Sequence, residues 1–157
     1  MKIINLSLLF LITISFSSNA QDLKRIPPSA GTEYPNGWFK FIEQGAAFDV
    51  EVLGGNLVQG NVTWFDQTKY SGSFSGHDIS GKGTYIWVDG RRYEGSFREN
   101  KRHGWGVMYY SDGTKHHGKW KNNKRHGKGK VYDKEGKLVK EGKWENDIFI
   151  GAKKKKK

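Results

Sequence analysis

The chain contains no cysteine among its 157 residues. This absence excludes a disulfide framework and a thiol nucleophile. The sequence also lacks a Gly-x-Ser-x-Gly string and a phosphate-binding loop of the Walker type, which mark many hydrolases and nucleotide-binding enzymes. We therefore expect a protein that is not an enzyme, with no catalytic residue and no cofactor. A small enzyme whose catalytic residues form no recognisable motif is the alternative.

Metal-binding signatures are missing as well. The C-terminal half contains His103, His116, His117 and His126, but no cysteine and no glutamate stands at metal-motif spacing from them. Two of these histidines belong to a repeated Arg-His-Gly string. A structural role in turns or at strand ends is therefore favoured over a metal site.

Acidic residues are scarce in the second part of the chain. Up to Lys69 there are five basic and six acidic side chains, whereas residues 70–157 carry 22 basic and 10 acidic ones, a net charge of +12. A positive field of this size favours anionic partners such as phospholipid headgroups, an acidic envelope polymer, nucleic acid or an acidic protein.

Long apolar runs are absent except near the N-terminus, where one extends from Ile3 to Phe16. A lysine precedes it and Ser18-Asn19-Ala20 follows it, which is typical of a secretory signal peptide over residues 1–20, cut after Ala20. The alternative is a membrane anchor, but the run is shorter than the roughly 20 residues that span a bilayer. We expect an exported protein, periplasmic, at the cell surface or secreted, for which nucleic acid is not an expected partner.

The chain does contain a pattern of glycine and aromatic residues that returns every 23 residues. Its first half-motif begins at Tyr70, Tyr93, His116 and, one residue late, Lys140. A second half-motif is Gly-x-Gly, and a third is an acidic residue followed by glycine, as in Asp112-Gly113. A fixed period of this length predicts a stacked array, whose units cannot bury a core alone.

Within each unit the marked residues alternate, which predicts strands with one buried side. Each unit is interpreted as a β-hairpin, with a polar turn such as Glu99 to His103 between its strands and an Asp-Gly bend into the next hairpin. Glycine inside a strand is unfavourable, so its return predicts an aromatic ring from a neighbouring strand over the bare backbone. The expected fold is all-β, an elongated array of stacked antiparallel β-hairpin repeats.

The strings from Tyr93 to Gly106 and from Gly118 to Gly129 closely resemble the MORN repeat (membrane occupation and recognition nexus). The resemblance covers residues 70–151 and implies stacked hairpins that form a lipid-binding or protein-binding scaffold. The first unit departs from it at Ser75 to Ile79, where the Lys-Arg-His string is missing, and the last unit lacks a second strand.

The remaining segments give the domain organisation. Residues 21–37 are expected to form a flexible leader, residues 38–69 a degenerate repeat or capping strands, residues 70–152 the array, and residues 153–157 a lysine tail. Trp38 to Phe41, Phe48 to Val52 and Asn61 to Trp64 alternate and predict short strands. The sequence fixes no oligomeric state.

The basic strings Lys101-Arg102-His103 and Lys124-Arg125-His126 would occupy equivalent turns and line one edge of the array. They predict an anion-contacting ridge, although charged turns also serve solubility alone. The candidate residues are Lys101, Arg102, Lys124, Arg125, Lys128, Lys130, Lys153, Lys154, Lys155, Lys156 and Lys157.

Rings in phase with the glycines are expected to form a thin core, whereas Trp105 and Tyr109 are out of phase. These two are candidates for exposed aromatics at a lipid headgroup boundary or against a sugar. They are equally compatible with a face covered by the curved sheet or by a partner chain. The expected function is an interaction module at an anionic membrane or envelope surface, and the alternative is a scaffold or oligomerisation module with an acidic protein partner.

Overall fold

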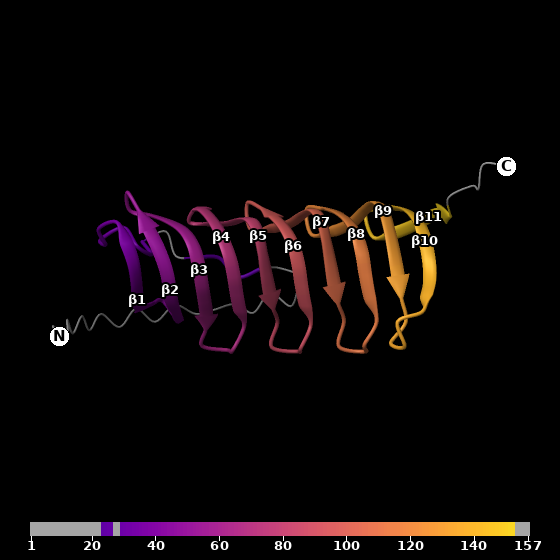
Figure 1. Ribbon diagram of the computed structural model, residues 1–157, viewed down its shortest axis with the longest axis horizontal. Coiled ribbons are helices and arrows are strands. Elements are labelled where there is room, and N and C mark those ends of the chain that lie inside the picture. The colour runs from indigo at the N-terminus through magenta and orange to yellow at the C-terminus, as the bar shows by residue number, and fades with distance from the viewer. Residues whose placement is uncertain (1–22, 27–28, 153–157) are drawn as a thin grey trace, which may run out of the picture.

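The computed structural model describes residues 23–26 and 29–152. These residues form one open antiparallel sheet in which strands follow one another in chain order, and Figure 1 shows that the sheet is elongated. The all-β prediction of stacked hairpins is confirmed. The strands are β1 (Gly37–Glu43), β2 (Ala46–Leu53), β3 (Asn56–Trp64), β4 (Lys69–Gly76), β5 (Asp78–Ile86), β6 (Arg92–Arg98), β7 (Lys101–Tyr109), β8 (Lys115–Lys121), β9 (Lys124–Tyr132), β10 (Leu138–Glu145) and β11 (Ile148–Ala152).

Two kinds of turn alternate along the array. From β5 onward, acidic-Gly loops form one edge, and in the loop before β8 the Asp112 carboxylate accepts the backbone N–H of Thr114 at 2.9 Å. The opposite edge has two-residue turns, and from the β6–β7 turn onward both turn residues have positive φ, such as Glu99 (φ 49°) and Asn100 (φ 58°). Such turns match the twist of paired strands. The predicted turn from Glu99 to His103 is therefore too long, because β7 already begins at Lys101.

One face of the sheet carries the buried aromatic residues and the close glycine contacts. A Cβ atom on Gly106 would lie 2.3 Å from the Tyr93 hydroxyl oxygen, and one on Gly129 would lie 2.5 Å from the His116 ring. Both rings come from a neighbouring strand, as predicted. This face is called the inner face below, and the opposite one the outer face.

Rings of successive units meet edge to face along the inner face. Their centroids are 5.6 Å apart for Tyr70 and Phe97 and 5.5 Å apart for Tyr93 and Trp120. His116 replaces the tyrosine in the next unit and contacts Trp144 in the same way, at 5.1 Å. Edge-to-face pairs add stabilisation beyond the buried area, so the ring ladder links each hairpin to the next.

The segment before β1 packs against the inner face. Leu23, Ile26 and Ala30 are buried in the core, and the Lys24 backbone N–H donates to the Tyr85 hydroxyl at 3.0 Å. The expected flexible leader is therefore wrong for residues 23–26 and 29–37. Lys24 thus lies at β5, whereas Tyr34 lies at β1 and stacks on Phe41. Pro27 and Pro28 lie outside the described residues.

The two ends of the array differ from expectation in one respect. The alternating segments before Tyr70 form β1, β2 and β3 as predicted, although their origin as a degenerate repeat stays a prediction. At the other end, β11 pairs with β10, so the last unit has the second strand that was expected to be missing.

The signal peptide over residues 1–20 and the lysine tail lie outside the described residues. Within residues 23–26 and 29–152, no helix is long and apolar enough to cross a membrane.

Candidate binding faces of the sheet

The structure divides the predicted basic ridge between the two faces. Arg102 is only 2% exposed, and its guanidinium lies 4.7 Å from the Trp120 ring centre on the inner face. Arg125 lies in the same way over Trp144, at 4.2 Å. The prediction of a solvent-facing ridge is therefore wrong for both arginines, because their side chains lie on the inner face against Trp120 and Trp144, where Arg125 stays 27% exposed.

The lysines of the predicted set behave differently. Lys101, Lys124 and Lys128 are exposed, whereas Lys130 is half-buried and its Nζ lies 3.6 Å from Glu141. Lys153 to Lys157 lie outside the described residues.

The same pair of hydrogen bonds holds each arginine in place. The backbone N–H of Arg102 donates to the Asn123 side-chain oxygen at 2.8 Å, and its Nη2 donates to the Asn123 carbonyl at 2.7 Å. Arg125 makes the same two bonds with Asp147, at 2.9 Å and 3.0 Å. Ile79 occupies the equivalent position in the first unit. The sequence held a signal for this placement, since Arg102 precedes Gly104 and Gly106 by even steps and so shares their face.

The inner face opens into a pocket of about 400 Å³ over β7, β8 and β9. We call this pocket the inner groove. Its lining includes Arg102, Tyr110, His116, Trp120, Arg125 and Asp147.

Burial controls the charge state of the inner groove. It lowers the pKa of Arg102 to about 10, so this side chain is still protonated at neutral pH. Burial, together with the nearby Arg125 charge, lowers the pKa of His116 to about 4, so its imidazole is neutral at pH 7. The groove thus presents fixed positive charge beside a neutral ring.

Stability should depend on pH through His116. Its folded pKa of about 4 lies below the ordinary value near 6.5, so the unfolded chain binds the proton more tightly. The contribution is present above pH 6.5 and is lost as the pH falls towards 4. Between pH 7 and pH 5 we expect the wild type to lose about 2 kcal/mol more unfolding free energy than His116→Tyr, which restores the residue found at Tyr93.

Urea denaturation of both proteins at the two pH values measures this difference. Equal losses in the wild type and the variant would contradict a buried, neutral His116.

The outer face carries a row of exposed side chains across β7 to β10. Trp105 is 47% exposed and pairs in register with Lys119, while Lys128 pairs with Lys143 on the next two strands. We call Trp105, Lys119, Lys128 and Lys143 the outer basic row. The Lys119 ammonium lies 5.8 Å from the Trp105 ring centre. An amphipathic indole beside cations suits the boundary of a charged surface.

Tyr109 is half-buried and differs from Trp105 in its surroundings. The Arg92 guanidinium covers its ring at 4.3 Å, and its hydroxyl donates to Glu94 at 3.3 Å. The structure does not bring Tyr109 together with the exposed indole.

The histidines are also separated. His116 is buried on the inner face, whereas His117 is exposed on the outer face beside Trp105, 6.0 Å away between ring centres. Across residues 23–26 and 29–152, no three His, Cys, Asp or Glu side chains come together in a way that could hold a metal ion.

The repeat geometry agrees with a comparison against protein families. The MORN repeat model matches residues 70–91, 93–115 and 116–137, the three units that share the ring ladder. No curated protein matches the chain. Residues 70–137 therefore consist of MORN repeats, which generally serve as interaction and membrane-binding modules.

Proposed function

We propose that this protein is a non-enzymatic module that docks on an anionic membrane or envelope surface through its outer face. The observation that carries the proposal is the outer basic row, in which an exposed indole and three exposed lysines lie side by side across four strands. Lys101 and Lys124 add charge at the edge of the two-residue turns. Export after Ala20, predicted from the sequence, would place this face against lipid headgroups or an acidic envelope polymer.

The energetics favour a surface over a single small ligand. Each basic residue near an anionic membrane contributes about 1 kcal/mol, and the attraction decays within about 8 Å at physiological salt. An open sheet places many cations at a similar distance from a flat surface that docks on it, so their contributions add. Trp105 then supplies the apolar contact at the headgroup boundary.

Changing the lysines of the outer basic row to glutamine should weaken binding to anionic vesicles. For Lys119→Gln, Lys128→Gln and Lys143→Gln combined we expect about a hundredfold loss, because roughly 3 kcal/mol of attraction is removed. Cosedimentation with mixed phosphatidylglycerol and phosphatidylcholine vesicles measures it. Pure phosphatidylcholine vesicles should bind poorly throughout.

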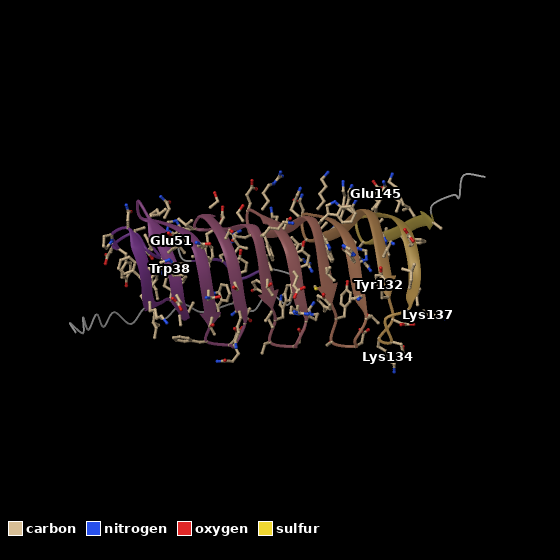
Figure 2. All side chains as sticks on the ribbon, in the orientation of Figure 1. Trp38, Glu51, Tyr132, Lys134, Lys137 and Glu145 are labelled. Carbon is tan, nitrogen blue, oxygen red and sulfur yellow. The ribbon has the colours of Figure 1, made fainter. Side chains whose placement is uncertain are left out.

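A matched control removes the same charge elsewhere. Lys134, Lys137 and Lys140 are exposed. Figure 2 places the first two at the edge of the acidic-Gly loops, and the Lys140 ammonium lies 5.9 Å from the ring centre of Trp144 on the inner face. Their combined change to glutamine should weaken binding only slightly. Equal effects of the two triple variants, or binding that ignores salt, would refute docking through this row. Salt-insensitive binding to a protein that is lost on Trp105→Ala would favour the scaffold alternative.

A further inference from the structure

Arg102 is a buried cation that forms no ion pair with any described residue, although the Asp147 carboxylate lies near enough to act on its charge. In the next unit the Arg125 Nε lies 3.2 Å from a carboxylate oxygen of Asp147. The residue in the position of Asp147 is Asn123 for Arg102, and its amide carries no charge. A guanidinium that is 2% exposed is unfavourable without an anionic partner. The site is therefore short of one negative charge.

The inner groove beside Arg102 also contains a polar side chain without a partner. His116 is 0% exposed, and neither of its ring nitrogens has a hydrogen-bond partner among the described residues. Its neutral imidazole carries one N–H donor. Buried donors are normally paired, so His116 and Arg102 together offer donors to an anion inside the groove.

The inner face already accommodates a chain segment over the earlier strands. There, Leu23 and Ile26 are buried against the sheet and Lys24 bonds to Tyr85 through its backbone. Trp120 and Tyr110 continue the aromatic lining in the inner groove. The aromatic surface therefore extends beyond the part that the leader covers. In the inner groove, unlike under the leader, this surface carries the positive charge of Arg102, which forms no ion pair with a described residue.

We propose that the inner groove binds an extended acidic peptide segment of a partner protein, with one carboxylate at Arg102 and His116. The apolar side chains of that segment lie on Trp120 and Tyr110, as Leu23 and Ile26 lie on the earlier rings. Arg102 and Arg125 disfavour a basic segment. Of the carboxylates that line the groove, Asp147 is engaged by Arg125, and Asp112 accepts hydrogen bonds from Thr114. This site is on the opposite face from the outer basic row, so both can be occupied together.

Fluorescence anisotropy with labelled peptides tests the site. The probes are Leu-Glu-Glu-Ile-Glu-Leu and its lysine counterpart Leu-Lys-Lys-Ile-Lys-Leu. The wild type should bind the glutamate peptide, and Arg102→Ile should weaken binding roughly ten- to a hundredfold, since a charged hydrogen-bond partner is lost. Isoleucine is accepted at this position in the first unit, as Ile79. Lys101→Gln removes the same charge from an exposed neighbour and should change binding less than about threefold.

Two further measurements on the wild type keep the test independent of the variant's folding. The Trp120 indole and His116 ring resonances should shift on adding the glutamate peptide, while the Trp105 indole should not. Competition with inorganic phosphate distinguishes a peptide site from a site for any anion. Phosphate should displace the glutamate peptide only weakly. The proposal is overturned if the Trp120 and His116 signals do not shift, if the protein prefers the lysine peptide, or if phosphate binds as tightly as the glutamate peptide. Each of these outcomes counts whether or not the protein binds anionic vesicles.

Discussion

Replacing Gly106 with valine is expected to lower the free energy of unfolding by about 3 kcal/mol or more. Even its Cβ would lie 2.3 Å from the Tyr93 hydroxyl oxygen and 2.4 Å from the adjacent ring carbon. The ring cannot move aside easily, because it is buried and packs edge to face on Trp120. Overpacking of a close-packed interior usually costs about 1 to 3 kcal/mol, and here a central ring of the ladder is displaced. Urea denaturation measures the loss.

Gly90 provides the control for this substitution. It has positive φ of 84° and nothing within 4 Å of a Cβ position, and asparagine tolerates such a conformation. Gly90→Asn should therefore change stability by less than about 1 kcal/mol. If Gly106→Val were as mild as Gly90→Asn, the account of glycine under a ring would be wrong.

Introducing charge into the leader should also destabilise the protein strongly. Leu23 and Ile26 are buried against the inner face, and burial of each such side chain contributes about 1.5 to 3 kcal/mol. The double variant Leu23→Asp and Ile26→Asp should lose about 4 kcal/mol of unfolding free energy. The loss is smaller if the leader detaches and the rest of the sheet stays folded. Thermal or urea unfolding of the protein measures the change.

Arg25 offers a matched control, because it is exposed between the two buried residues. Arg25→Asp introduces the same side chain into the same segment and should change stability by less than about 0.5 kcal/mol. A double variant as stable as Arg25→Asp would show that the leader does not pack on the sheet.

The sequence was sufficient to predict the repeated part of the fold. A 23-residue period, alternation within each unit and glycine at constant phase together indicate stacked hairpins, because each feature reports a local backbone requirement. The ring of Tyr93 over Gly106 was predictable for the same reason. The same pattern occurs in three units, so each unit independently supports the interpretation of a hairpin.

The placement of the arginines and of the leader could not be predicted in the same way. The polar string after Glu99 has the composition of a turn, but two residues with positive φ close the hairpin and Arg102 then enters the strand. Its buried position depends on Asn123 from the next unit. The leader is short and has no period, and its burial follows from an open inner face that needs cover. The burial of the leader is thus a tertiary effect without a local signal. For Arg102 the even spacing from Gly104 and Gly106 was a local signal, but the turn-like composition of the string concealed it.

The two faces of the sheet carry different chemistry, and this separation is the centre of the account. The outer face exposes lysines beside the Trp105 indole, whereas the inner groove holds the buried Arg102 and the half-buried Arg125 among rings. Docking of the outer face on a membrane would leave the inner groove accessible to a partner, so that the protein could connect the two.

The most direct test is a paramagnetic relaxation experiment with spin-labelled lipid in anionic vesicles. The indole N–H signals of Trp105 and Trp120 report the outer and inner faces separately. We expect strong broadening of the Trp105 signal on addition of the vesicles and retention of the Trp120 signal. Broadening of Trp120 with Trp105 retained, or equal broadening of both, would contradict docking through the outer face.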